Sequence, residues 1–430
     1  MISQIDELQV VIKLTERCNI NCSYCYVFHK GEESYKEHSP KFRKMLHHQL
    51  VEFINQGVQE FGIVKVNLTL HGGEPLLLGK QRLAEILEFF KLNIKAPELG
   101  YSIQTNAILI DEQWIELFSK YEVIVGVSID GHKEANDEYR VDHKGKGSYE
   151  QVVKGLALLK QAESSGRLNH VGGLAVINPK YHGGEIYRHL VDELGFTNID
   201  FSLPMDTYET YELDYSASDY GRFLAEVFEE WKGEINKIHL RSFVEFIQYI
   251  GNAHRLGQLT DVEQAMSTFP VESESLSIQQ ICISTEGHIS IDEMKPVPLE
   301  HEKYHIKTDS LKTFVNSQYN RTFLAPFNSI PNDCRECIWK NYCRGGSVYG
   351  VFVNRFNEKN HFNNKSIMCD ALRMMFSKIV QYMLEDGIEE SVVEGSLSYY
   401  PDKLIQLDNN SPFPLQLPRF ASHRIEVNVL

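Results

Sequence analysis

This 430-residue chain contains eight cysteines, and their spacing indicates that they could take part in chemistry. Three of them, Cys18, Cys22 and Cys25, lie within eight residues of one another, and the chain then runs for more than 250 residues without a cysteine. The remaining five are Cys282, Cys334, Cys337, Cys343 and Cys369. Randomly placed buried cysteines would scatter, so this grouping predicts two metal centres in different parts of the fold.

The first group has three residues between Cys18 and Cys22 and two between Cys22 and Cys25. Three thiolates on one tight loop can hold three irons of a [4Fe–4S] cluster and leave the fourth iron open to an exogenous ligand. The alternatives are a zinc site that lacks its fourth ligand, or ordinary buried cysteines. The spacing favours the cluster.

The second group consists of four cysteines in the last third of the chain, Cys334, Cys337, Cys343 and Cys369. Four thiolates close a tetrahedral zinc site or a fully ligated [4Fe–4S] cluster equally well, so these residues alone leave the metal open. Cys282 stands apart from them. It is either a further ligand or a small buried side chain.

Strands and helices that must position these cysteines alternate along the first half of the chain. The apolar patterns predict strands at 10–14, 64–70, 101–106, 123–129, 171–177 and 199–203, and helices at 39–61, 80–94, 111–120, 148–163 and 184–194. Repeated βα units require a parallel sheet with right-handed crossovers. The fold class is therefore α/β, and six units predict a partial (β/α)6 barrel that resembles an incomplete TIM barrel.

Polar and glycine-rich loops follow three of these strands, at the end of the sheet where the cysteine loop also lies. They are His71-Gly-Gly-Glu-Pro75, Gln104-Thr-Asn106 and Ser128-Ile-Asp-Gly131. Adjacent glycines let backbone groups approach a ligand closely. Any one of these loops could be a simple turn, but their common position predicts a single site.

Composition limits the classes of function. Lysine and arginine number 43 against 59 aspartates and glutamates, a net charge of −16, which argues against a nucleic-acid or anionic-membrane binder. No apolar run approaches the roughly 20 residues of a membrane span, and the N-terminus does not resemble a secretory signal. We therefore expect a cytoplasmic protein, in which stable disulfides are uncommon.

Together these residues resemble the radical S-adenosylmethionine (SAM) superfamily, and more narrowly its members with a C-terminal SPASM domain. The family's CX3CX2C loop, with an aromatic before the last cysteine, matches 18–25, its GGEP motif matches 72–75, and its SPASM CX2CX5C…C pattern matches the second group. Residues 128–140 resemble a segment of anaerobic sulfatase maturases, with His132 in place of a proline and Asn136 in place of a histidine. The resemblance implies a radical SAM core at 1–235, a helical bridge at 236–275, an iron–sulfur SPASM domain at 276–385 and a tail at 386–430.

The resemblance also implies cofactors and their ligands. Cys18, Cys22 and Cys25 would hold a [4Fe–4S] cluster whose open iron binds SAM, and the reduced cluster would cleave SAM to a 5′-deoxyadenosyl radical that abstracts hydrogen from substrate. The second group would hold at least one auxiliary [4Fe–4S] cluster. An electron donor such as flavodoxin or ferredoxin is implied as well. The implied SAM contacts are Tyr24, Gly72, Gly73, Glu74, Gln104, Asn106, Ser128 and Arg140.

The chain departs from the sulfatase maturases at their second auxiliary cluster. In the segment 282–293, Cys282 is kept but Asp292 stands where a cysteine ligand is expected, and Ser347 replaces another. This site is therefore absent, incomplete, or an unusual one that uses Cys282 and Asp292. Asp292 or Glu293 could instead deprotonate substrate as a catalytic base, although both could also belong to a solvated acidic turn.

Three functions follow from these patterns. The first is a maturase that cross-links side chains of a ribosomally made precursor peptide by a carbon–carbon or ether bond. It is favoured by the depleted second auxiliary site and by an N-terminus too short for a leader-binding domain ahead of residue 10, so the leader would bind a strand edge or a partner protein. The second function is oxidation of a sulfatase Cys or Ser to formylglycine. The third, of another class, is a zinc-stabilised binding protein without turnover.

Overall fold

The computed structural model describes residues 2–30, 33–211, 214–257, 274–291, 297, 303–327, 329–349 and 352–398. Its strands lie in one sheet, in the order β10-β9-β8-β1-β2-β3-β4-β5-β6-β7. Their bounds are β1 Ile2–Thr15, β2 Lys65–Gly72, β3 Glu98–Thr105, β4 Ile124–Ser128, β5 Val171–Val176, β6 Asn198–Ser202, β7 His239–Leu240, β8 Glu274–Ile283, β9 His288–Ser290 and β10 Tyr304–His305.

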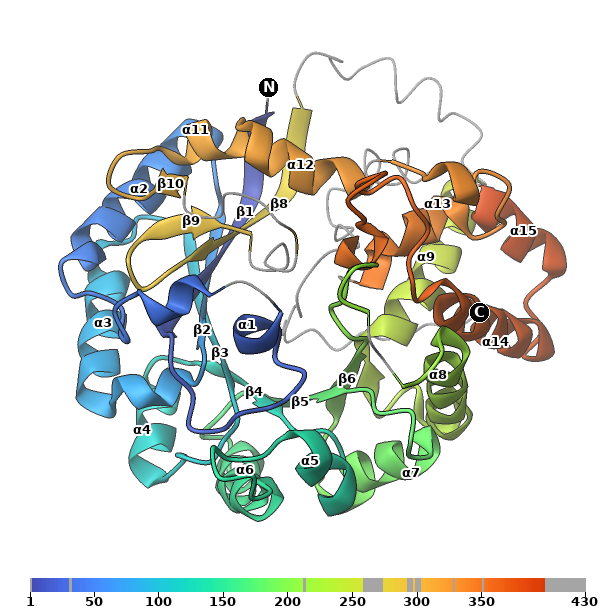
Figure 1. Ribbon diagram of the computed structural model, residues 1–430, viewed down its shortest axis with the longest axis horizontal. Coiled ribbons are helices and arrows are strands. Elements are labelled where there is room, and N and C mark those ends of the chain that lie inside the picture. The colour runs from blue at the N-terminus through green and yellow to red at the C-terminus, as the bar shows by residue number, and fades with distance from the viewer. Residues whose placement is uncertain are drawn as a thin grey trace.

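The central part of this sheet is parallel and curved. Every neighbouring pair from β8 through β1 to β7 is parallel, and only the β8-β9-β10 edge is antiparallel. Figure 1 shows the strands bending around an open centre, with helices outside them. In the part of the chain that the structure describes, β7 and β10 do not pair with each other. The predicted α/β class and partial barrel are confirmed.

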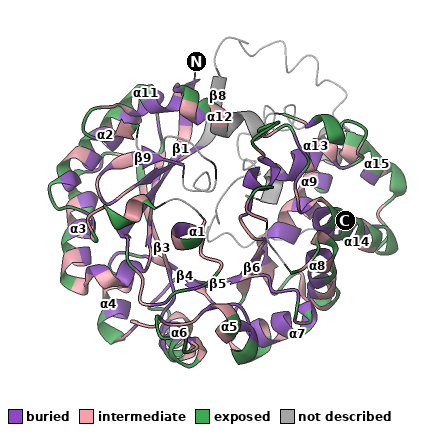
Figure 2. Ribbon diagram, in the orientation of Figure 1, coloured by how far each residue is buried: buried purple, intermediate pink, exposed green. Residues whose placement is uncertain are grey.

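The helices of the core cover the outer face of the sheet. They are α2 Leu46–Phe61, α3 Lys80–Asn93, α4 Glu112–Lys120, α5 Lys133–Tyr139, α6 Tyr149–Ser164, α7 Gly183–Arg188 and α8 Ala217–Trp231. Alternate residues of β2, Val66, Leu68 and Leu70, are fully buried, as expected for a strand that packs against a helical layer. Figure 2 shows buried residues along the strands and on the inner sides of the helices. None of the described helices is long and apolar enough to cross a membrane.

Local signals placed one helix wrongly. Ser39 and Pro40 predicted a helix start at residue 39, but α2 begins at Leu46. The backbone N–H of Phe42 instead bonds the carbonyl of Leu14 (2.9 Å), and Lys41 pairs with Thr15, so this segment extends the pairing at the end of β1. Backbone pairing with a distant segment therefore outweighs the local capping signal.

The sheet also extends beyond the predicted core. β8 pairs in parallel with β1, so that Cys282 lies opposite Val11, and the expected domain boundary at residue 276 falls inside this strand. The later helices are α11 Leu311–Val315, α12 Gln318–Phe327, α13 Lys340–Cys343, α14 Cys369–Glu385 and α15 Glu390–Ser398. Of these, α14 packs on α8 and α15 packs on α9 (Arg241–Gly257). The last segment, 399–430, lies outside the described residues.

Candidate active site at the cysteine loop

The first cysteine group lies on the loop that follows β1, and this loop ends in the short helix α1 (Tyr26–His29). Figure 1 shows α1 within the opening of the curved sheet. The backbone N–H of Cys25 bonds the carbonyl of Cys22 at 3.1 Å, so the last turn before α1 is tight. None of the eight cysteines is in a disulfide.

Burial changes the acidity of these thiols. It raises the pKa of Cys18 to about 12, and it raises the pKa of Cys22 and Cys25 as well. The neighbouring sulfurs add to the shift at Cys18, because thiolates close together repel one another. The thiols are therefore neutral near pH 7, and binding a metal or cluster must release their protons.

A segment far along the chain holds the cysteine loop in place. The backbone N–H of Asn21 bonds the carbonyl of Val141 (2.7 Å), and His143 Nε2 lies 2.9 Å from the carbonyl oxygen of Cys18. This segment follows α5 and is over 100 residues from the loop. Sequence reasoning did not find this clamp, since no local pattern links the two segments.

The two glycines of the GGEP motif are needed because the loop after β2 packs tightly on the backbone of the cysteine loop. A Cβ on Gly72 would lie 2.1 Å from the carbonyl oxygen of Thr15, and one on Gly73 would lie 2.3 Å from that of Arg17. Gly72 also has a φ of +132°, which only glycine adopts readily. These glycines thus fix the approach of two site loops.

Glu74 is buried and ties the loops after β2 and β3 together. Its carboxylate accepts hydrogen bonds from the backbone N–H of Leu76 (3.0 Å) and Asn106 (2.8 Å) and from the hydroxyl of Thr105 (2.8 Å). Burial raises the pKa of Glu74, and the two N–H bonds oppose that shift. Because three donors inside the protein already engage this carboxylate, its clearest role is to brace the site.

Three other residues with implied SAM contacts also gather at this end of the sheet. Asn106 donates from Nδ2 to Asn19 of the cysteine loop (2.8 Å), and the same nitrogen lies 3.8 Å from the sulfur of Cys18. Gln104 donates to the hydroxyl of Ser128 at 2.7 Å, which joins the ends of β3 and β4. The predicted convergence of these loops is therefore present in the structure.

The electrostatic centre of the site is a buried network of Tyr24, Asp130 and Arg140. The Tyr24 hydroxyl donates to Asp130 at 2.7 Å and accepts from Arg140 Nη1 at 2.9 Å. Asp130 also accepts from the backbone N–H of Val176, so it braces β5. Within the described part of the chain, Arg140 Nε has no hydrogen-bond partner, although this side chain is 5% exposed. A buried, unsatisfied cationic donor beside the cysteine loop suits an anionic group such as the carboxylate of SAM.

The second cysteine group lies in the C-terminal region, around α13 and the start of α14. Burial raises the pKa of Cys334 to about 11 and also raises the pKa of Cys343 and Cys369, with further contributions from the neighbouring sulfurs. The four sulfurs therefore lie within electrostatic reach of one another. Sequence reasoning missed Arg355, a fully buried arginine beside this group whose Nη1 donates to the carbonyl of Arg344 (3.0 Å).

The spacing of these side chains bears on the choice between a cluster and a single ion. Among the residues that the structure describes, no three Cys, His, Asp or Glu side chains lie close enough together to bind one metal ion. Tetrahedral zinc holds its sulfurs roughly 4 Å apart, whereas the thiolates of a cubane cluster are separated by the cluster itself. The spacing that a single zinc ion would need is therefore not preformed among the described residues, and the four cysteines of the second group leave the choice between zinc and a cluster open.

The remaining candidate residues are described only in part. Cys282 is buried within β8, opposite Ser290 of the neighbouring strand β9. Asp292 and Glu293, the proposed unusual ligand and catalytic base, lie outside the described residues.

Known proteins resemble this chain along most of its length. Residues 12–179 match the model of the radical SAM superfamily. The chain is 25% identical to the cysteine-type anaerobic sulfatase-maturating enzyme of Clostridium novyi, over 86% of this chain and 95% of that enzyme. It is 24% identical to the serine-type enzyme of Bacteroides thetaiotaomicron, over 85% and 87%.

Solved structures show the same fold. The structure of native anSMEcpe with bound AdoMet and the Cp18Cys peptide superposes with a TM-score of 0.70 at 20% identity, and the match covers 88% of this chain and 98% of that one. The predicted resemblance to the radical SAM superfamily and to anaerobic sulfatase maturases is confirmed, and residues 12–179 are the part that matches the superfamily. This finding favours iron–sulfur over zinc for the cysteine loop.

Proposed function

We propose that this chain, which contains a radical SAM domain, is a maturase that oxidises a side chain of a peptide or protein substrate. One observation supports this most strongly. The cysteine loop and the unsatisfied Nε of Arg140 meet at the end of the sheet where the loops after β2, β3 and β4 converge. The chain thus offers thiols for a cluster and a buried cation for the carboxylate of SAM at one place.

In this proposal Cys18, Cys22 and Cys25 hold a [4Fe–4S] cluster. When bound with SAM and reduced, that cluster supplies the homolytic chemistry that removes a hydrogen atom from the substrate. The protein supplies position and charge. The Nε–H of Arg140 would bind the carboxylate of SAM, and Tyr24 holds the guanidinium in place through its hydroxyl. Gly72 and Gly73 let the backbone after β2 lie close to Thr15 and Arg17. In that position their backbone would meet the amino group of SAM.

The second cysteine group has a supporting part in the proposal. Cys334, Cys337, Cys343 and Cys369 hold at least one auxiliary [4Fe–4S] cluster, which either relays electrons or orders the C-terminal region. An external donor such as flavodoxin or ferredoxin supplies the electron for each cleavage. Asp292 or Glu293 remains our candidate for a base that takes the substrate proton.

Two substrates fit this chemistry. Two of the relatives that match most of the chain are sulfatase-maturating enzymes, which favours formylglycine formation on a sulfatase. The replacement of an expected cysteine ligand by Asp292 favours the second candidate, a cross-link within a ribosomal precursor peptide. Cross-linking and the oxidation of serine each remove two hydrogen atoms, so a change in mass alone does not separate these two products.

The test combines mass spectrometry with aldehyde capture. The full-length protein, reconstituted with iron and sulfide and supplied with SAM and a reductant, is incubated with a sulfatase peptide and with short peptides encoded beside its gene. A hydrazide-reactive product identifies formylglycine, and loss of two hydrogens without hydrazide capture identifies a cross-link.

The control is the triple variant Cys18→Ala, Cys22→Ala, Cys25→Ala, which should leave every peptide unchanged. A product that persists in this variant contradicts the proposed role of the loop. Cleavage of SAM by the wild-type protein without modification of any peptide would direct the search to other substrates, whereas absence of SAM cleavage contradicts the proposal itself.

A further inference from the structure

A pocket of about 510 Å³ lies outside the cysteine site, between the start of α2 and the start of α3. Its charged lining residues are Lys44, Lys80, Arg82 and Glu85, which leave a net positive charge on a protein whose overall charge is −16. Local charge of the opposite sign to the whole chain favours anionic ligands at that place.

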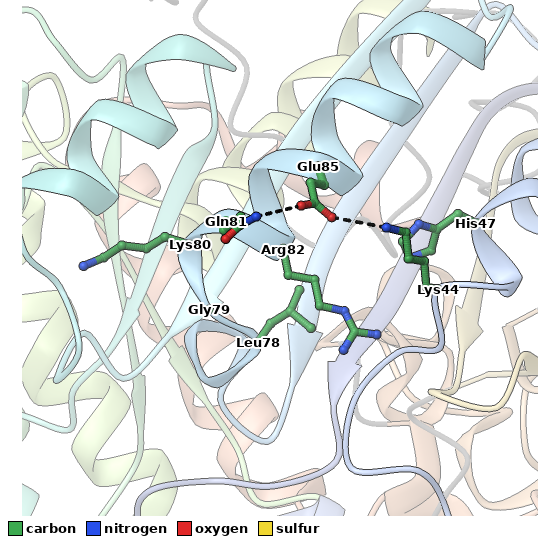
Figure 3. A pocket seen from close by; sticks show the side chains of 8 residues that line it. All are labelled: Lys44, His47, Leu78, Gly79, Lys80, Gln81, Arg82 and Glu85. Carbon is green, nitrogen blue, oxygen red and sulfur yellow. Dashed lines mark hydrogen bonds and ion pairs between the residues drawn. The ribbon is translucent and has the colours of Figure 1, made fainter.

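Figure 3 shows how these side chains are arranged. Lys80 points away from the other basic residues and bonds Asp111, the N-cap residue of α4, so its charge is already compensated. Arg82 extends toward the side of the pocket that carries Lys44, and its Nη2 bonds the backbone carbonyl of Phe42. A carbonyl does not neutralise the guanidinium, so Arg82 keeps its charge and further N–H donors for a ligand.

Lys44, the other lysine of this pocket, has a weak ion-pair partner within the described part of the chain. Lys44 lies 3.6 Å from Glu85, which in turn accepts a hydrogen bond from Gln81, and the side chains of Lys44 and Glu85 are 80% and 48% exposed. Exposed ion pairs of this length contribute little to stability. Lys44 can therefore exchange Glu85 for a ligand at small cost.

A buried histidine provides the second observation. His47 lines the pocket and is only 6% exposed, yet its Nε2 has no hydrogen-bond partner among the described residues. Its ring stacks on Phe42 at 5.6 Å between centroids, which fixes the ring plane. The pKa of His47 is lowered to about 4, chiefly by burial and also by the charges of Arg82, Lys44 and His48, against the opposing effect of Glu85. A buried polar atom without a partner costs free energy, and a bound ligand would remove that cost.

The pocket lies close to the rim of the candidate active site. Leu78 and Gly79 end the loop that begins with the GGEP motif, and Lys44 follows the segment that pairs with the end of β1. The N–H of Glu16, two residues before Cys18, bonds the carbonyl of Pro40 at 3.2 Å. A substrate peptide that enters the cysteine site across this rim would therefore pass over the pocket.

We infer that the pocket formed by Lys44, His47 and Arg82 binds an oxyanion, and that in function this is a carboxylate of an acidic segment of the substrate. The assignment to substrate rests on the proposed function, but the oxyanion site itself does not. Arg82 would donate to the oxyanion in a charge-assisted bond, Lys44 would add a second charge, and His47 would satisfy its Nε2.

The first test measures binding without catalysis. Sodium phosphate and sodium acetate are titrated into the full-length protein at constant ionic strength while the histidine ring signals are followed by NMR, with His47→Gln identifying the signal of His47. We expect bound phosphate to raise the pKa of His47 by about one pH unit, because an anion stabilises the protonated ring. Arg82→Gln should weaken phosphate binding by roughly tenfold, since it removes one charge-assisted bond.

The matched control is Lys91→Gln, which removes an exposed charge from the last turn of the same helix. It should leave phosphate binding unchanged. Equal weakening by Arg82→Gln and Lys91→Gln would show that the anion only screens charge, and this result, like a His47 signal that does not respond, would overturn the site.

The second test separates a substrate carboxylate from a free ion. A synthetic peptide rich in Glu and Asp and its twin with Gln and Asn are each competed against phosphate at His47. Displacement by the acidic peptide alone supports the substrate assignment. Equal behaviour of the two peptides overturns that assignment and leaves a site for a small ion only. Both tests measure binding and neither requires peptide modification. The oxyanion site could therefore be confirmed even if the proposed function were wrong.

Discussion

Arg140 donates a hydrogen bond to the hydroxyl of Tyr24, with 2.9 Å between Nη1 and the oxygen, although the two residues are 116 positions apart. Tyr24 lies within the cysteine loop, and Arg140 follows α5. The bond therefore couples the position of the loop to the position of the cation. Any ligand that Arg140 holds through its unsatisfied Nε is placed relative to the three thiols.

The first prediction concerns this arginine. Arg140→Lys keeps the positive charge but removes Nε and the planar pair of donors, so we expect SAM to bind at least about tenfold more weakly. Equilibrium dialysis with the reconstituted protein measures this affinity. Arg222→Lys, a half-exposed arginine on α8, is the control and should bind SAM normally. An unchanged affinity in Arg140→Lys would remove this residue from the SAM site.

The second prediction concerns the glycine motif. In Gly73→Ala the new Cβ would lie 2.3 Å from the carbonyl oxygen of Arg17 and 2.8 Å from the ring of Phe28, so the loops must move apart. We expect a loss of about 2–3 kcal/mol in the free energy of unfolding, measured with urea, and weaker retention of iron at the cysteine loop. Gly251→Ala is the control, because a Cβ at this position of α9 meets nothing within 4 Å. That variant should be as stable as the wild type or more stable by about 0.5–1 kcal/mol.

The parts of this arrangement that the sequence could predict are those whose sequence signal lies within one short segment. The cysteine spacings and the loops at the strand ends are local patterns, and the parallel sheet follows from the alternation of strands and helices. The pairing of β8 with β1 was not predictable, since its partners are about 270 residues apart and no crossover pattern joins them. The clamp of Val141 on Asn21 and the placement of Arg355 were missed for the same reason. The predicted start of α2 was wrong because backbone pairing with β1 outweighed a local capping signal.

The third prediction is a pH dependence of stability. Burial raises the pKa of Glu245 on α9 from its usual 4.5 to about 8; Asp200 adds to the shift and Arg241 opposes it. Because the folded-state pKa is raised, Glu245 contributes its full stabilisation below pH 4.5 and loses it as the pH rises to about 8. Glu245→Gln should therefore unfold at higher urea concentrations than the wild type at pH 9, but not at pH 4.5.

The control for this measurement is Glu116→Gln, which changes an exposed glutamate of α4. In this variant the change in the urea midpoint of unfolding between pH 4.5 and pH 9 should be the same as in the wild type. If Glu245→Gln has the same urea midpoint relative to the wild type at both pH values, the carboxyl of Glu245 titrates normally in the folded protein.

The fourth prediction concerns Arg355 at the second cysteine group. Its guanidinium is fully buried and donates to the carbonyls of Phe362 (2.7 Å) and Arg344 (3.0 Å), and the latter residue directly follows Cys343. Its charge acts on Cys334, whose pKa it lowers against the larger effect of burial. Four thiolates make either a zinc site or a cluster at this place anionic, so a nearby buried cation stabilises the site and favours any added electron.

We therefore expect Arg355→Gln to lower the reduction potential of a C-terminal cluster by roughly some tens of millivolts, because a buried positive charge that acts on these sulfurs is lost. A redox titration followed by electron paramagnetic resonance measures this potential. Arg355→Lys keeps the charge and should stay closer to the wild type, which separates charge from packing. If both variants retain the cluster and share the wild-type potential, Arg355 only fills space. If the site takes up zinc but no iron, the second group is a structural zinc site, because a closed four-cysteine site accepts either metal.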